Sequence, residues 1–339
     1  MKLKISQLTT LAIAIVALGL TGCDPSSKAP DSNSTASAQK PAKTFAMNVL
    51  VSTVPFFDDT RATWSAIGKY NGVTTVYGGP VNTDPQTQIN EIEALLSKGL
   101  DGLVVAPCDS AALAPVINKA VEKGVMVVTY LNDVPASKRT TYVTSELEEA
   151  SLKVGRHVIQ KNNNPAKAII VYAEAGNLEQ MGRRRGFEML TNEFANLQIV
   201  AVVEDKFDAA KATEQMQPLL AKFPDVAYVF GCGSRSAVGT VAALRELKFK
   251  PGQVVVTGWD YDEDELNLIS EGWVTVAAAQ NTSYMTQIAF NILEGNVGGY
   301  LYPINHPFKE HGVRALPEKI VVPVELVTKS NLLGYMPRK

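Results

Sequence analysis

The feature that most constrains the fold is a repeated alternation of short apolar runs and amphipathic stretches, which begins near Met47. In a first series we expect strands near 47–53, 74–77, 103–106, 125–130 and 142–144, with helices near 57–70, 84–98, 110–123 and up to about 160. In a second series we expect strands near 167–173, 198–203, 226–230, 253–257 and 274–278, with helices near 178–195, 210–222, 235–247, 262–270 and 282–294. Near-continuous apolar strands separated by helices are typical of parallel sheets covered on both faces. The sequence therefore predicts an α/β protein with two doubly wound parallel sheets.

Composition and charge exclude several classes of protein. Hydrophobic residues make up 46% of the chain and charged residues 19%, which excludes intrinsic disorder and collagen-like structure. A net charge of −2 carries no basic excess, so we expect no nucleic-acid partner. Three cysteines cannot form a disulfide framework. After residue 22, no apolar run reaches the roughly 20 residues that span a bilayer.

The first 22 residues have the pattern of a secretory signal. Lys2 and Lys4 precede an apolar run from Leu11 to Leu20, which is followed by Thr21, Gly22 and Cys23. This ending resembles the lipobox of bacterial lipoproteins, which implies cleavage before Cys23 and a lipid on its thiol. A plain signal peptide is the alternative. Asp24 resembles the signal that retains lipoproteins at the inner membrane, so we expect a periplasmic protein anchored there.

Residues 23–45 are expected to form a flexible linker. Between residues 24 and 43 the chain has no aromatic and no large aliphatic side chain, so it cannot bury enough surface to offset the entropy of ordering. The linker would hold a globular body away from the membrane surface.

Aromatic, acidic, amide and arginine residues recur directly after the predicted strands. In doubly wound sheets, ligands bind outside the carboxyl ends of the strands. Aromatic rings stack on C–H patches, and planar polar groups make paired hydrogen bonds with neighbouring hydroxyls. This mixture of side chains therefore favours a polyhydroxylated ligand. The residues in question include Pro55–Asp59, Pro107–Asp109, Leu131–Asp133, Glu174–Arg185, Gly231–Arg235, Gly258–Asp260 and Gln280–Asn281.

The order of these features resembles the type I periplasmic sugar-binding proteins of ABC transporters, in their ribose/galactose/xylose branch. The resemblance rests on Val54-Pro55-Phe56-Phe57, Asp84-Pro85 with Gln88, the run from Leu100 to Pro107, Gly258-Trp259-Asp260, and Gln280. It implies two lobes joined by three crossovers at a hinge, with the ligand clamped between them. The first lobe would comprise 46–144 plus 281–308, and the second 145–280 plus 309–339.

The resemblance also implies which residues bind the ligand. Phe56 and Phe57 would stack on it, although one of them could instead fill the core. Arg183, three residues before Gly186-Phe187, would contact the ligand unless it is a surface charge. The remaining candidates are Asn132, Asp133, Trp259, Asp260 and Gln280. For Asp260 the alternative is a helix N-cap, and Trp259 could stack on the ligand or pack beneath it.

Three departures from the family put an ordinary aldopyranose ligand in doubt. Val54 stands where relatives commonly have an asparagine, and the segment 231–235 lacks an asparagine that relatives often have there. Leu131 stands at a position that is usually polar in the family. A smaller or less polar polyol, a modified sugar or a furanosyl signalling molecule are the alternatives.

The expected function is that of a monomeric solute-binding lipoprotein, which captures a sugar or polyol and delivers it to an ABC permease. The alternatives are a receptor that presents the ligand to a membrane kinase or chemoreceptor, and an envelope enzyme. No catalytic, phosphate-loop or dinucleotide motif is present, so we expect no enzyme and no cofactor. The three histidines are not spaced like a metal site, and Cys108 and Cys232 are expected to be free thiols rather than a redox pair across the cleft.

Overall fold

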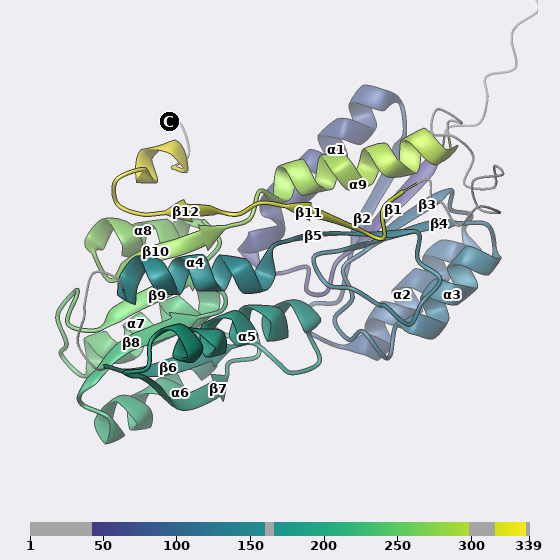
Figure 1. Ribbon diagram of the computed structural model, residues 1–339. Helices are drawn as coiled ribbons and strands as arrows, with labels where there is room; N and C mark the ends of the chain where they lie inside the picture. Colours follow the sequence, from purple (N-terminus) through teal and green to yellow (C-terminus); the bar gives the residue numbers. More distant parts are fainter. Residues whose placement is uncertain (1–42, 160–165, 298–315, 337–339) are drawn as a thin grey trace, which may run out of the picture. The chain divides into compact units, whose positions relative to one another are not determined.

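The computed structural model describes residues 43–159, 166–297 and 316–336, and within them the chain forms two six-stranded sheets (Figure 1). The predicted signal peptide, Cys23, most of the linker, and His306 and His311 lie outside the described residues. In the described part of the chain, no helix combines the length and the apolar character needed to span a membrane.

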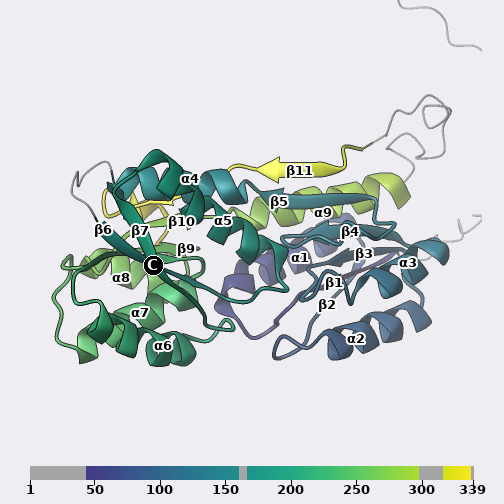
Figure 2. The same cartoon turned by 60° about the horizontal axis from the view of Figure 1, so that its bottom comes forward.

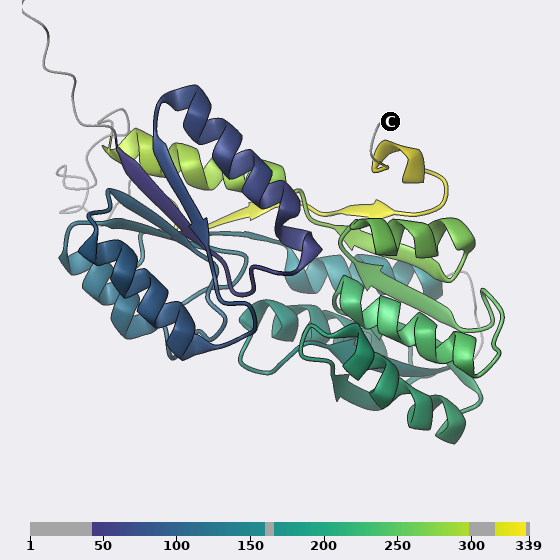
Figure 3. The same cartoon turned by 180° about the vertical axis from the view of Figure 1, so that it is seen from behind.

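The first lobe is built on a sheet with the strand order β11-β5-β4-β3-β1-β2, in which every pair is parallel. Its strands are β1 (Thr44–Asn48), β2 (Thr74–Gly78), β3 (Gly102–Val105), β4 (Met126–Tyr130), β5 (Thr141–Ser145) and β11 (Lys319–Val322). Its helices are α1 (Asp58–Asn71), α2 (Pro85–Ser97), α3 (Ala114–Glu122) and α9 (Thr282–Val297). In Figure 3, α1 and α9 cover one face of this sheet and α2 and α3 the other.

The second lobe repeats this topology with the order β12-β10-β9-β8-β6-β7. Its strands are β6 (Ala166–Tyr172), β7 (Leu197–Glu204), β8 (Val226–Gly231), β9 (Val255–Trp259), β10 (Val274–Ala279) and β12 (Glu325–Val327). Its helices are α4 (Leu147–Ile159), α5 (Leu178–Glu193), α6 (Ala209–Lys222), α7 (Ser234–Glu246) and α8 (Glu263–Glu271). Only β12 runs antiparallel to its neighbour among the paired strands described. The prediction of two doubly wound α/β lobes is thus confirmed.

The chain crosses between the lobes three times within the described residues. The first crossing lies between β5 and α4, the second between β10 and α9, and the third between β11 and β12. We expected residues 309–339 in the second lobe, but Lys319–Val322 pair with β5 in the sheet of the first lobe (Figure 2). The physical reason is that Lys319–Val322 extend the edge of the first sheet beside β5, whereas Glu325–Val327 pair with β10 in the second sheet.

Buried apolar side chains form one core cluster in the first lobe and one on each face of the second sheet. The first strand differs most from its predicted bounds, because it ends at Asn48 rather than near 53. Val49, Leu50 and Val51 are buried all the same. These residues of the apolar run therefore lie beyond the end of β1, at the edge of the sheet where the site lies.

Candidate functional site

A cavity lies between the two lobes, at the carboxyl ends of strands from both sheets; we call it the interlobe cavity. From the first lobe its lining consists of Leu50, Val51, Val54, Phe56, Phe57 and Leu131. From the second lobe it consists of Ala173, Asn177, Glu179, Gln180, Arg183, Asp205, Phe207, Gly233, Ser234, Arg235, Ser236 and Asp260. Its volume is about 40 Å³, far below the 300–1,000 Å³ common for ligand pockets. In this arrangement of the lobes the cavity therefore has room for only a few ligand atoms.

Contacts between the lobes hold this arrangement. The Asn132 side chain accepts a hydrogen bond from the backbone N–H of Glu179 at 3.2 Å, and the Tyr261 hydroxyl donates to Asp59 at 3.1 Å. Phe207, from the second lobe, packs against the core of the first. The crossings between the lobes are short, which is the usual arrangement for hinge closure around a ligand.

Arg183 is brought into the cavity by helix α5. The helix begins after Asn177, whose side chain accepts from the backbone N–H of Gln180, and Arg183 is the sixth residue of the helix. The guanidinium carbon lies 3.9 Å from the centroid of the Trp259 ring. Its Nη1 donates to the carbonyl of Cys232 at 2.7 Å, and its Nη2 donates to Glu179 and to Gln280, each at 2.6 Å. Arg183 is therefore a buried, positioned cation and not a surface charge.

The Nε of Arg183 is buried and has no hydrogen-bond partner. The same is true of Oδ1 of Asp260. Among the described residues that line the cavity, these two are the only ones with a buried side-chain atom in this condition. A buried donor or acceptor without a partner is costly, so these atoms point to groups that a ligand supplies.

Asp260 follows strand β9 directly. Its backbone N–H extends the ladder by donating to Ala278 at 2.8 Å, and its φ of 79° turns the side chain out of the strand direction. The N-cap of helix α8 is Asp262, so Asp260 does not have that role. Burial raises the pKa of Asp260 to about 7, partly offset by the positive charge of Arg183.

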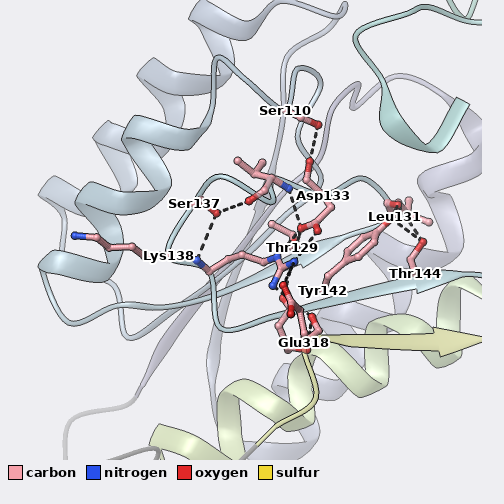
Figure 4. Close-up of polar contacts among 12 residues, drawn as sticks. Ser110, Thr129, Leu131, Asp133, Ser137, Lys138, Tyr142, Thr144 and Glu318 are labelled. Carbon is pink, nitrogen blue, oxygen red and sulfur yellow. Dashed lines mark hydrogen bonds and ion pairs between the residues drawn. The ribbon is translucent and has the colours of Figure 1, made fainter. Parts of the chain in front are cut away.

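Leu131 has the equivalent place in the first lobe, directly after strand β4. Its N–H donates to Val143 at 2.9 Å, and its φ is 60°. Its carbonyl accepts hydrogen bonds from the hydroxyls of Tyr142 and Thr144 (Figure 4). Of the five described non-glycine residues with φ between 56° and 79°, Leu131, Phe207 and Asp260 line the cavity. Such backbone strain is concentrated at ligand sites in proteins.

Phe56 and Phe57 lie on a short 3₁₀ helix, Pro55–Phe57, and pack edge to face with ring centroids 4.9 Å apart. Both line the cavity, but Phe57 is only 3% exposed and belongs to the core, whereas Phe56 is half-buried. Phe56 also lines the wider, acidic opening beside the cavity, together with Asp58, Asp59 and Tyr261. Of the two rings, Phe56 has the position that a ligand can reach.

Asn132 and Asp133, which we predicted as ligand contacts, are not among the residues that line the cavity. Both polar atoms of the Asn132 side chain already have protein partners. The amide oxygen accepts from the N–H of Glu179, and the amide nitrogen donates to the carbonyl of Pro107 at 2.7 Å. Asp133 points to Arg139, which donates to both carboxylate oxygens, at 2.6 and 2.7 Å. The hydroxyl of Thr129 also donates to Asp133, at 2.7 Å, and Figure 4 shows these two residues together.

Trp259 and Gln280 support Arg183 without lining the cavity. The indole is fully buried beneath the guanidinium, so Trp259 packs under the site. Gln280, at the second crossing, accepts from Arg183 and donates to Glu179 at 2.9 Å.

Several lining residues were not singled out from the sequence. Glu179, Gln180 and Asn177 lie in a segment that the strand-end rule covers, but nothing in the sequence distinguishes them from their neighbours. Asp205 and Phe207 directly follow strand β7, and the same rule applied to that strand would have found them. Burial raises the pKa of Asp205 to about 6.

The other candidate chemistry is not supported by the geometry. Cys108 and Cys232 are buried free thiols, and burial raises the pKa of Cys108 to about 12. No group of three His, Cys, Asp or Glu residues in the described ranges is placed to hold a metal ion.

Comparison with known proteins identifies consistent relatives. A family model described as a periplasmic binding protein domain matches residues 45–299. A ribose import binding protein of Bacillus subtilis is 27% identical over 87% of this chain and 94% of its own length. A D-ribose/D-allose-binding protein of Pseudomonas aeruginosa is 27% identical over 73% of this chain and 75% of its own length. A solute-binding protein from Burkholderia graminis, solved in complex with D-arabinose, superposes with a TM-score of 0.79 at 24% identity, covering 88% of this chain and 100% of that one.

Proposed function

Because the chain belongs to the periplasmic binding protein family, whose members bind solutes without turning them over, we propose that it captures a sugar or sugar-like polyol in the interlobe cavity. The relatives named for ribose, allose and arabinose support this ligand class. Phe56, Arg183 and Asp260 would touch the ligand, Phe57 would support the ring of Phe56 from the core, and Trp259 and Gln280 would hold Arg183 in place.

The observation that carries the proposal is the pair of buried, unpartnered atoms, Arg183 Nε and Asp260 Oδ1. One atom donates and the other accepts, and a hydroxyl group does both. A molecule with neighbouring hydroxyls satisfies both atoms at once, whereas an apolar molecule leaves both without partners. The half-buried ring of Phe56 offers an apolar surface on which the C–H groups of a sugar can lie.

The test is a binding screen with the full chain carrying Cys23→Ser, which removes the expected lipidation site. The protein is heated with pentoses, hexoses and polyols, and hits are measured by titration calorimetry. A ligand at one hundred times its Kd stabilises the folded state by about 2.7 kcal/mol. We expect at least one sugar or polyol to raise the melting temperature, and amino acids and short peptides to leave it unchanged. If no sugar or polyol does so, the proposal is wrong.

We further propose that residues 1–22 are a signal peptide, that lipidated Cys23 anchors the monomeric protein at the periplasmic side of the inner membrane, and that the ligand passes to an ABC permease. The lipobox-like run before Cys23 supports the anchor, and family membership supports the permease. Mass spectrometry of the protein from membranes tests the anchor, with Cys23→Ser as control. Uptake of the labelled ligand by cells that lack this protein tests the delivery step, because transport should fall while the permease is still present.

A further inference from the structure

The two walls of the interlobe cavity have opposite chemical character. Every first-lobe side chain that lines it is apolar, and these are Leu50, Val51, Val54, Phe56, Phe57 and Leu131. The second lobe supplies the charged and hydrogen-bonding side chains, including both unpartnered atoms. A ligand held between the walls therefore meets hydrogen-bonding groups on one side and hydrocarbon on the other.

Leu131 and Asp260 lie at equivalent positions of the two lobes, where the first lobe has an apolar side chain and the second has an acidic one. Each residue directly follows the fourth strand of its lobe, donates its N–H to the next strand, and has a positive φ. Aspartate tolerates this backbone conformation, because its short polar side chain can hydrogen-bond locally. Leucine gains nothing comparable, so the backbone is strained at Leu131, at a point where the side chain lines the cavity.

The backbone at Leu131 also offers nothing to a ligand hydroxyl. Its N–H is bonded to Val143, and its carbonyl already accepts from Tyr142 and Thr144. A hydroxyl placed against Leu131 would thus be buried without a partner. Such burial costs enough to lower the affinity by roughly ten- to one-hundredfold.

We propose that the ligand is amphipathic, with hydroxyls toward Arg183 and Asp260 and a deoxygenated edge, such as a methyl or methylene group, toward Leu131. This inference rests on the proposed function and makes it narrower: the site selects deoxy or methyl-bearing sugars and polyols over their fully hydroxylated counterparts. In this proposal, Leu131 is the residue that determines the preference for the deoxy ligand.

The experiment compares matched pairs on the full chain with Cys23→Ser. Titration calorimetry measures D-ribose against 2-deoxy- and 5-deoxy-D-ribose, D-galactose against D-fucose, and D-glucose against its 2-deoxy and 6-deoxy forms. We expect the deoxy member of the best-bound pair to bind at least tenfold more tightly. A smaller preference, or a preference for the hydroxylated member, overturns the inference while the proposed function stands. If no member of any pair binds, the proposed function fails and the inference with it.

The variant Leu131→Asn tests the role of the residue. Asparagine tolerates a positive φ and supplies both a donor and an acceptor, so we expect the preference to move at least tenfold toward the hydroxylated sugar. Leu333→Asn, at a leucine that is 87% exposed, is the matched control and should not change the preference. An equal loss of affinity for both members of the pair in Leu131→Asn would contradict the assignment. If that variant does not fold, the comparison of pairs on the unsubstituted site still decides the inference.

Discussion

The guanidinium of Arg183 lies on the ring of Trp259, 3.9 Å from its centroid, while one of its nitrogens donates to Glu179 at 2.6 Å. The charged side chains of the Arg183–Glu179 pair are 3% and 6% exposed. A buried ion pair is often no more stable than an apolar replacement, but removing one partner leaves an isolated buried charge. Variants of this pair can therefore separate the contribution of Arg183 to stability from its contribution to ligand binding.

We expect Arg183→Met to reduce the free energy of unfolding by about 3–5 kcal/mol, because Glu179 is left without its cation. The double variant Glu179→Gln, Arg183→Met should recover most of that loss, since no charge remains. Both variants should lose sugar binding. Urea unfolding and titration calorimetry measure the two effects. Binding that returns together with stability in the double variant would show that Arg183 has only a structural role.

Asp260 should make the ligand-free protein less stable as the pH rises. Its pKa is about 7 in the folded state against a usual 3.8, so the folded protein binds the proton more tightly than the unfolded chain does. Stability is therefore lost between about pH 4 and pH 7, with contributions of the same sign from Asp205 and Glu265, whose pKa values burial also raises.

Replacing Asp260 by asparagine removes this cost. We expect the stability of Asp260→Asn relative to the parent protein to be greater at pH 8 than at pH 5 by about 2 kcal/mol. The same variant should bind sugar at least tenfold more weakly at pH 8, because a charged acceptor is lost. Glu214→Gln, at an exposed position, is the control and should change neither property. If the difference in stability between Asp260→Asn and the parent protein did not vary with pH, the raised pKa of Asp260 would be contradicted.

Phe56 and Phe57 should respond differently to truncation. Phe57→Ala removes a ring that is 3% exposed from the core, which should cost about 3–5 kcal/mol of stability. Phe56→Ala should cost less stability but should weaken sugar binding, because its half-buried ring faces the cavity. Thermal unfolding and calorimetry on both variants check this. Equal effects on stability would contradict the division between core and ligand contact.

Asp133 should matter for folding and not for the ligand. Asp133→Asn removes the carboxylate that accepts two hydrogen bonds from Arg139 and leaves only the longer ion pair with Glu318, at 3.7 Å, so we expect a loss of about 3 kcal/mol in the free energy of unfolding. At a temperature at which the variant is fully folded, its affinity for the sugar should change less than threefold, since Asp133 does not line the cavity. A large loss of affinity in a folded Asp133→Asn protein would restore the ligand role that the sequence suggested.

The fold could be predicted because its signal is local and repeated. Most strands and helices lie within a few residues of their expected bounds, since apolar runs of strand length and amphipathic runs of helix length are each visible in the sequence. The predicted series lacks strands β11 and β12, because strands of four and three residues at the edge of a sheet carry almost no pattern of their own.

The site could be predicted only in part, for a different reason. Position after a strand places a residue at the edge of the sheet, and together with the family resemblance it indicated Phe56, Arg183 and Asp260, which line the cavity. It does not show whether a side chain turns into the cavity or back into its own lobe. Asp133 turns back because Arg139, six residues later, is within reach of its carboxylate. Leu131, directly before Asn132 and Asp133, does line the cavity, and its positive φ was not visible in the sequence.

The central claim is that ligand hydroxyls complete the hydrogen bonding of Arg183 and Asp260. A crystal structure with the tightest-binding sugar tests it most directly. We predict sugar hydroxyl oxygens within about 3.2 Å of Arg183 Nε and of Asp260 Oδ1, with the ring of the sugar between the two lobes. A sugar bound elsewhere on the protein, with both atoms still unpartnered or satisfied by the protein itself, would contradict the claim.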